Sequence, residues 1–94
     1  MLTTIVLLNV VKDRIEEVAE ELADMDEISE VFSVAGRYDL VAMVRSRDVD
    51  DLAQTVTRRL LKVQGITGSE SLFAFRVHSR HDMERVFSLG MEPE

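Results

Sequence analysis

Two neighbouring segments that are apolar on both faces limit the possible folds of this chain more than any other feature of the sequence. They cover residues 31–35 and 40–44 and are joined by the polar turn Gly36-Arg37-Tyr38-Asp39. Segments rich in Val and Phe favour strands, and a Gly followed closely by Asp favours a tight turn, so the sequence predicts a β-hairpin. Successive strand residues point to opposite faces, so Leu40, Ala42 and Val44 lie on one face of the strand. Val41 and Met43 lie on the other face. A sheet with one wet face would alternate with polar residues, so both faces of this sheet must be covered.

A strand and an amphipathic helix are predicted before the hairpin. Residues 2–11 form the expected strand, which is again apolar on both faces. A helix should follow it, capped by Asp13, with Glu16 completing a capping box. The apolar stripe of that helix is Ile15, Val18, Ala19, Leu22 and Ala23.

The same scheme repeats after the hairpin. Asp48 is expected to cap a second helix and Gly65 to end it. The apolar stripe of this helix is Val49, Leu52, Ala53, Val56 and Leu60. A final strand is expected from about Ser71 to His78. The order of elements predicts an α+β fold, the ferredoxin-like βαββαβ sandwich, with an antiparallel four-stranded sheet and both helices on one face.

The helix-free face of this sheet leads to a prediction about assembly. Two helices cover one side of four strands, so the apolar residues of the other side stay in water unless something else covers them. The simplest cover is the sheet of an identical chain across a two-fold axis, which makes a homodimeric α/β barrel. The alternative is that the tail after His78 folds back over the sheet through its apolar residues Met83, Val86, Phe87, Leu89 and Met91.

Composition excludes several kinds of function. With 11 basic and 18 acidic residues, the formal charge of -7 opposes nucleic-acid backbones and anionic membranes, so we expect neither as a direct partner. The chain has no cysteine, which excludes disulfides and thiolate chemistry. Its apolar start lacks the basic residues and cleavage site of a signal peptide and is too short to span a bilayer, so we expect a soluble, cytoplasmic protein.

Patterns that would indicate catalysis or metal binding are weak. His78 and His81 lie three residues apart without a third ligand, which is more typical of surface histidines than of a zinc site. A group of acids has no nucleophile nearby and is more typical of a solvated edge: Asp24, Asp26, Glu27 and Glu30. We therefore expect no enzyme, no metal site and no cofactor.

The hairpin turn offers a binding function instead. Gly36 lets backbone N–H groups approach a ligand, Arg37 is suited to a carboxylate, and Asp39 is suited to an ammonium group. Together these residues suit a zwitterion. The alternative is a purely structural turn, because Gly and Asp also shape turns without binding anything and Tyr38 can simply cover the edge of the core.

The hairpin also resembles that of a known family of regulators. Residues 31–44, and Gly36-x-Tyr38-Asp39-Leu40 within them, are similar to the signature turn of the Lrp/AsnC ligand-binding domain, also called RAM, for regulation of amino-acid metabolism. Residues 64–75 are similar to the family's loop and final strand. The resemblance implies a sheet-to-sheet dimer, ring-like higher oligomers and an amino acid or related effector bound between subunits. It also implies ligand-binding roles for Gly36, Tyr38 and Asp39, with Ser69 and Ser71 in the facing loop, and leaves Arg37 at a variable position.

We therefore expect an effector-binding domain at residues 1–80 and a tail at residues 81–94, which forms a short helix packed on the dimer. Regulators of this kind carry a helix-turn-helix domain before the sheet, whereas the first strand of this chain begins at residue 2. The expected function is that of a stand-alone effector-binding module that modulates the transcription of amino-acid metabolism without its own DNA-binding domain. Two alternatives stay open: a dimeric α/β-barrel enzyme of the monooxygenase or isomerase type, and a structural partner subunit of a full-length Lrp/AsnC regulator.

Overall fold

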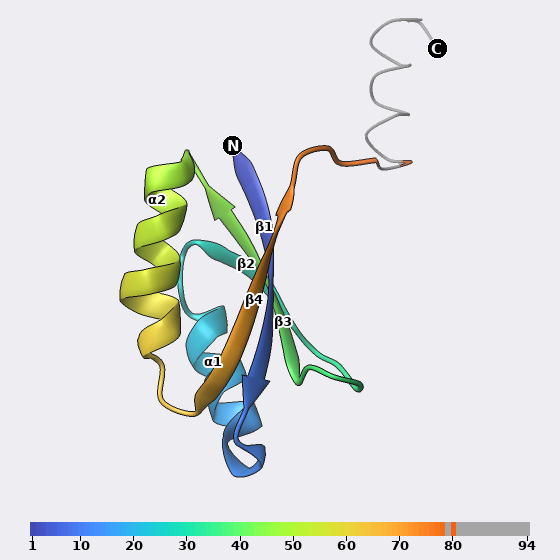
Figure 1. Cartoon of the computed structure of the whole chain (residues 1–94), viewed down its shortest axis with the longest axis vertical. Helices are drawn as coiled ribbons and strands as arrows, with labels where there is room; N and C mark the ends of the chain where they lie inside the picture. The colour runs from blue at the N-terminus through green and yellow to red at the C-terminus, as the bar shows by residue number, and fades with distance from the viewer. Residues whose placement is uncertain (79, 81–94) are drawn as a thin grey trace, which may run out of the picture.

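The chain folds into one four-stranded sheet with two helices on one side of it (Figure 1). The computed structural model describes residues 1–78 and 80. Its main elements are, in order, β1 (Leu2–Val10), α1 (Ile15–Ala23), β2 (Ile28–Ser33), β3 (Leu40–Ser46), α2 (Val49–Gln54) and β4 (Ile66–Ala74). The strands lie in the order β2-β3-β1-β4, and every neighbouring pair is antiparallel. The expected ferredoxin-like α+β fold is therefore confirmed.

The predicted hairpin is present, and one of its faces forms the core. Phe32 lies opposite Val41, and Ser33 lies opposite Leu40. Alternate residues of the two central strands are buried between the sheet and the helices: Val6, Leu8, Val10, Leu40, Ala42 and Val44. The helical segments add Val18, Leu22, Leu52 and Leu60 to this core. Because burial of each Val or Leu side chain contributes roughly 1.5–3 kcal/mol, this layer provides the main stabilisation of the fold.

The other side of the sheet carries a second apolar surface, which we call the open face. Residues directly opposite each other in an antiparallel pair share a face, so the register places these apolar residues on it: Ile5, Leu7, Phe32, Val41, Met43, Leu72 and Ala74. Phe32 and Leu72 are 47% and 43% exposed. Figure 1 shows α1 and α2 on the opposite side. The tail, which is the alternative cover for this face, lies at residues 81–94 and so outside the described residues.

The start of α1 differs from the prediction. Asp13 lies in a single 3₁₀ turn, Lys12–Arg14, and the residue before α1 is Arg14, which makes no side-chain capping bond. The predicted Asp13 cap, and with it the capping box with Glu16, is therefore wrong. The Arg14 N–H donates to the Val11 carbonyl at 3.0 Å, which closes the tighter turn and delays the helix.

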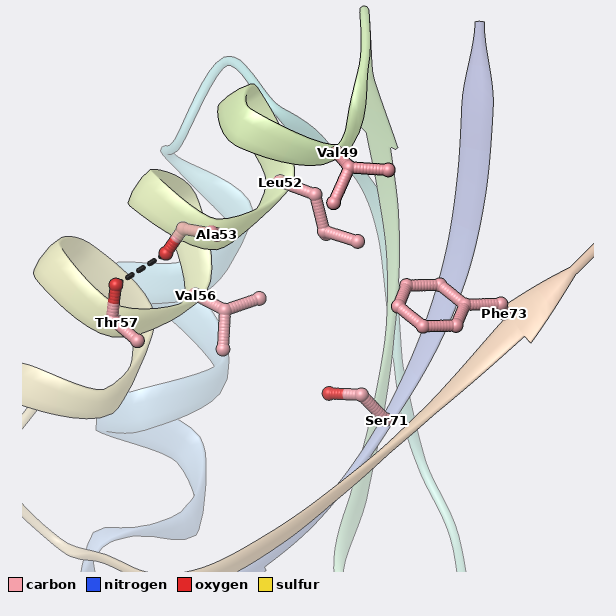
Figure 2. Close-up of a pocket in the computed structure, with 7 residues that line it drawn as sticks. All are labelled: Val49, Leu52, Ala53, Val56, Thr57, Ser71 and Phe73. Atoms are coloured by element: carbon pink, nitrogen blue, oxygen red, sulfur yellow. Dashed lines mark hydrogen bonds between the residues drawn. The ribbon is translucent and has the colours of Figure 1, made fainter.

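A shallow apolar groove lies between α2 and β4. It has a volume of about 190 Å³, and its lining comes from one side of the helical segment and one edge of the sheet: Val49, Leu52, Ala53, Val56, Thr57, Ser71 and Phe73. Figure 2 shows Phe73 and Ser71 of β4 directed toward the side chains of Leu52 and Val56. The apolar stripe of the second helix predicted that Val49 packs on the sheet. Val49 instead lies at this groove and is 63% exposed.

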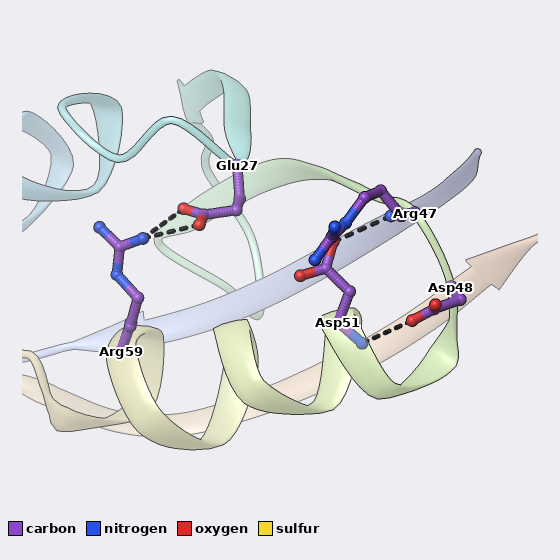
Figure 3. Close-up of polar contacts among 5 residues, drawn as sticks. All are labelled: Glu27, Arg47, Asp48, Asp51 and Arg59. Carbon is purple, nitrogen blue, oxygen red and sulfur yellow. Dashed lines mark hydrogen bonds and ion pairs between the residues drawn. The ribbon is translucent and has the colours of Figure 1, made fainter.

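Polar contacts fix the second helical segment at both ends (Figure 3). The Asp51 N–H donates to Asp48 Oδ1 at 2.8 Å, which confirms the predicted N-cap. The Arg47 N–H donates to Asp51 Oδ2 at 2.9 Å, and this bond, with the Arg47 side chain, lowers the pKa of the Asp51 carboxyl. At the other end, Arg59 Nη1 lies 2.6 and 2.7 Å from the two carboxylate oxygens of Glu27.

The end of this helical segment is irregular. A π-helical turn, Thr55–Arg59, and a 3₁₀ turn, Leu60–Lys62, follow α2, so Gly65 comes three residues after the last helical residue. Gly65 has a φ of +106°, and a Cβ at this position would lie 3.1 Å from Arg14 Nε and 3.2 Å from Val18 Cγ2. A glycine is therefore required there both by the backbone and by the close approach of α1. Within residues 1–78 and 80, no helix is long and apolar enough to cross a membrane.

The last strand begins earlier than predicted. β4 starts at Ile66 and ends at Ala74, whereas the sequence favoured a strand from about Ser71 to His78. Ser69 lies opposite Leu8, and Glu70 lies opposite Leu7, so the polar segment pairs with β1 through its backbone. An edge strand that is largely exposed does not need apolar side chains, and hydrophobic patterning therefore misses it. Phe75 and Val77 follow the strand and are 96% and 62% exposed.

Candidate functional site at the hairpin turn

The connection between β2 and β3 projects beyond the sheet and carries four of the predicted ligand-binding residues. The Val34 N–H donates to the Asp39 carbonyl at 3.0 Å and closes the connection. Gly36 is exposed and has a φ of +134°, a backbone conformation that residues other than glycine rarely adopt. No heavy atom counted around Gly36 lies within 4 Å of an added Cβ, so the backbone there is open to a ligand.

Asp39 holds this turn against the end of β1. Its N–H donates to the Leu8 carbonyl at 2.8 Å, and its Oδ2 accepts from the Val10 N–H at 2.9 Å. These bonds fall where the register between β1 and β4 shifts, between Asn9 and Val10. One oxygen of the Asp39 carboxylate is thus already used by the backbone. In the structure Asp39 therefore positions the turn. Direct contact of its carboxylate with an ammonium group stays a prediction.

Tyr38 connects the turn to β4. Its hydroxyl donates to Glu70 Oε1, and the guanidinium carbon of Arg37 lies 6.0 Å from the centre of its ring. The hydrogen bond to Glu70 raises the pKa of the Tyr38 hydroxyl, and burial and the Glu70 charge act in the same direction. The hydroxyl therefore stays protonated at neutral pH and remains a donor.

Glu70 is a site residue that the sequence reasoning missed. It lies opposite Leu7 and so on the open face, between two serines that point the other way. The alternation Ser69-Glu70-Ser71 is the sequence signal that separates these side chains, but without apolar residues it is equally typical of a loop, in which side chains do not alternate between two faces. Glu70 brings an acidic group to a turn that already has a basic one in Arg37.

The two predicted serines lie apart from the Tyr38–Glu70 contact. Ser69 and Ser71 are opposite Leu8 and Val6, so they are on the helix side of β4. They belong to the strand and not to a loop facing the turn, which corrects the expectation. Both are exposed, and Ser71 lines the groove beside α2.

The arrangement is suited to noncovalent recognition of a small polar ligand. Arg37 offers donors in a fork that matches a carboxylate, Glu70 offers an acceptor for an ammonium group, and Gly36 leaves the backbone accessible. In residues 1–78 and 80, no three His, Asp or Glu side chains come close enough to hold a metal ion. His78 is exposed, and His81 lies outside the described residues.

Comparison with known proteins agrees with this architecture. The family model described as the Lrp/AsnC ligand binding domain matches residues 3–84. Among curated relatives, the HTH-type transcriptional regulator FL11 of Pyrococcus furiosus is 27% identical over 73 residues, which cover 78% of this chain and 48% of the regulator. The chain spans about half the length of the curated relatives it matches.

Solved structures share the fold. The crystal structure of TTHA0845 from Thermus thermophilus is 40% identical, with a TM-score of 0.79, and the match covers 85% of this chain and 100% of that one. A transcriptional regulator from Neisseria meningitidis, solved as a complex with L-Met, has a TM-score of 0.75 at 20% identity, over 84% of this chain and 54% of that one. At that identity the Neisseria structure shows a shared fold alone.

Proposed function

Because the chain belongs to the Lrp/AsnC ligand-binding domain family, we propose that it is a regulatory module whose effector is an amino acid or a related zwitterion. The observation that carries this proposal is the placement of opposite charges around Tyr38 at the hairpin turn. Arg37 stacks near Tyr38, and Tyr38 donates to Glu70, so a guanidinium and a carboxylate stand on either side of one phenol. A free amino acid presents the complementary carboxylate and ammonium groups.

In this proposal the turn residues have separate roles. Gly36 supplies open backbone, Arg37 binds the carboxylate, and Tyr38 holds Glu70 in place for the ammonium group. Asp39 keeps the turn docked on β1 and so positions the other groups. Because Ser69 and Ser71 lie on the helix side of β4, in this proposal they contact an effector that is held by the turn of a neighbouring chain. The Neisseria regulator, which shares this fold, was solved with L-Met, so the fold can be found with an amino acid bound.

The functional unit is proposed to be a dimer formed through the open face. Phe32 and Leu72 remain 47% and 43% exposed on that face, beside partly buried residues such as Val41 and Met43. An apolar patch of this kind on one side of a sheet is typical of a surface that another protein covers. A two-fold axis lets the same patch cover itself. Ring-like assembly of such dimers is part of the same proposal.

The module is proposed to act in transcriptional regulation of amino-acid metabolism, in the cytoplasm, on its own or with a full-length Lrp/AsnC regulator as its partner. The match to the Thermus thermophilus structure covers 100% of that solved chain, which supports a role for the ligand-binding part by itself. A formal charge of -7 disfavours direct contact with DNA, so the proposal includes none. No catalytic step is part of it.

Titration calorimetry of the full chain against each proteinogenic amino acid tests the effector. We expect one chemical class of amino acid to bind in the micromolar to millimolar range, and Arg37→Ala to weaken that binding at least tenfold. Arg58→Ala is the matched control, because it removes another exposed arginine, from the π-helical turn. Absence of heat with every amino acid, or equal loss in both variants, would refute the proposal.

A further inference from the structure

Asn9 lies at the end of β1, where this strand meets the hairpin turn. Both of its neighbours in the chain are bonded to Asp39. The Asp39 N–H donates to the Leu8 carbonyl at 2.8 Å, and the Val10 N–H donates to Asp39 Oδ2 at 2.9 Å. Figure 1 shows the end of β1 and the connection between β2 and β3 at the same end of the sheet. The backbone on either side of Asn9 is therefore fixed to the turn, which gives the precise placement that a binding residue needs.

The side chain of Asn9 shares a face with Glu70. Successive residues of β1 alternate between faces, so Asn9 lies on the open face with Ile5 and Leu7. Asn9 is paired with Gly68 and Leu7 with Glu70, which makes Asn9 and Glu70 diagonal neighbours on adjacent strands. Diagonal neighbours are about 7–8 Å apart and lie within reach of long side chains. One small molecule is thus large enough to contact both Glu70 and the carboxamide of Asn9.

Gly68, opposite Asn9, is not required by the backbone or by the packing of the described residues. Its φ is not positive, unlike that of Gly36 and Gly65. Of the atoms counted in residues 1–78 and 80, an added Cβ would come within 4 Å of Asn9 alone, at 3.7 Å from Nδ2 and 3.9 Å from Cβ. Glycine weakens a strand and often marks a place that a ligand or another backbone approaches closely. The β-bulge between Asn9 and Val10 is a second feature that is common beside binding sites.

We propose that Asn9 binds the side chain of the effector, and that the effector is an amino acid whose side chain ends in an uncharged hydroxyl or carboxamide group. This inference rests on the proposed function, in which Arg37 and Glu70 bind the two charged groups of an amino acid. Asn9 then contacts the remaining part of the molecule, and Gly68 leaves room for it. The proposed function does not itself depend on Asn9.

The chemistry of the Asn9 carboxamide selects this class. The group has N–H donors and a carbonyl acceptor, so it pairs in both directions with a hydroxyl or with another carboxamide. An apolar side chain in the same place would remove water from the carboxamide without replacing its hydrogen bonds, and binding sites of this kind strongly reject such analogues. An acidic side chain would be repelled by Glu70, and a basic one would compete with the ammonium group of the same effector for Glu70.

Titration calorimetry of the full chain with two isosteric pairs of amino acids tests this selectivity. The pairs are threonine with valine and asparagine with leucine, whose members have nearly the same shape and differ in the polar group. We expect the polar member of at least one pair to bind about tenfold more tightly than the apolar member. Asn9→Leu should remove this preference. A merely structural role of Asn9 would lower the affinity for both members equally.

Two further variants separate the side-chain contact from effects on the fold. Thr3→Val is the matched control, because Thr3 is a half-buried polar residue on the same face of β1, about 20 Å from Asn9. It should leave the polar preference unchanged. Gly68→Ala fills the space beside Asn9, and its backbone accepts the change. This variant should weaken binding of the polar effector about tenfold while its Tm stays equal to that of the natural chain or rises.

The inference and the proposed function fail in different ways. If an amino acid binds and Arg37→Ala weakens it, but Asn9→Leu leaves the polar preference unchanged, the role of Asn9 is overturned and the proposed function stands. The same conclusion follows if the preferred effector is apolar or charged. If Gly68→Ala changes the mass measured by light scattering and not the affinity, the space belongs to a contact with another chain, which also overturns the inference. If no proteinogenic amino acid gives heat, both are refuted.

Discussion

Replacement of Asp39 by alanine is the sharpest test of how the binding turn is held. The change removes the acceptor of the Val10 N–H, at 2.9 Å, and Val10 is only 5% exposed, so water replaces this acceptor poorly. Loss of a hydrogen bond to a charged acceptor typically costs about 1.5–3 kcal/mol. Because Asp39 is partly exposed, we expect a loss near the lower end, about 1.5–2 kcal/mol.

For a domain of this size, 1 kcal/mol corresponds to about 4–8 °C in Tm, so Asp39→Ala should lower the Tm by roughly 6–16 °C. The matched control is Asp39→Asn, whose amide oxygen still accepts from the Val10 N–H and should cost about 1 kcal/mol or less. Both variants are measured by calorimetry at one protomer concentration, because assembly makes the Tm concentration-dependent. A change in Tm below about 3 °C for Asp39→Ala would show that the turn is held by other contacts.

Three further results are expected. Since Tyr38 is the only tyrosine and tryptophan is absent from the sequence, near-ultraviolet titration reports its pKa directly; that pKa should lie above the usual value of about 10 and fall toward it in Glu70→Gln. The stabilisation from this contact is present below pH of about 10 and is lost as the pH rises through the pKa of the folded state. The pKa of Asp51 is lowered, chiefly by the hydrogen bond from the Arg47 N–H, so the pH dependence has the opposite sign. The stabilisation from the Asp51 carboxylate is present above a pH of about 4 and is lost as the pH falls through the folded-state pKa. Acid titration followed by circular dichroism should therefore show a smaller loss of stability at low pH in Asp51→Asn. Gly65→Ala should lower the free energy of unfolding by about 1–3 kcal/mol in denaturant titration, because the positive φ and the close side chains of Arg14 and Val18 both oppose a Cβ.

Glu70 illustrates why part of the site was not predictable from the sequence. It contributes the carboxylate that meets Tyr38, yet it lies in a polar segment without apolar periodicity, where hydrophobic patterning gives no strand. Pairing with β1 makes this segment a strand and sets Glu70 and Ser71 on opposite faces. The predicted grouping of Ser69 and Ser71 with the turn was wrong in geometry for the same reason.

Asp13 and Asp48 show the corresponding limit for helix starts. Both are acids placed before an amphipathic segment, and both were predicted as caps. Asp48 accepts from the Asp51 N–H, whereas Asp13 lies inside a 3₁₀ turn closed by the Arg14 N–H. The difference depends on how the chain leaves β1, which the residues near Asp13 do not encode by themselves.

The sequence by itself determined the βαββαβ order, the hairpin at residues 31–44 and the two apolar faces of the sheet. These properties follow from alternation and spacing within a few residues, which each segment carries locally. Only the tertiary structure decided that Asp39 supports Val10 and that Tyr38 meets Glu70, because these partners are 29 and 32 residues apart in the chain. Contacts of that separation depend on strand order and register, which arise when the whole sheet packs on its helices.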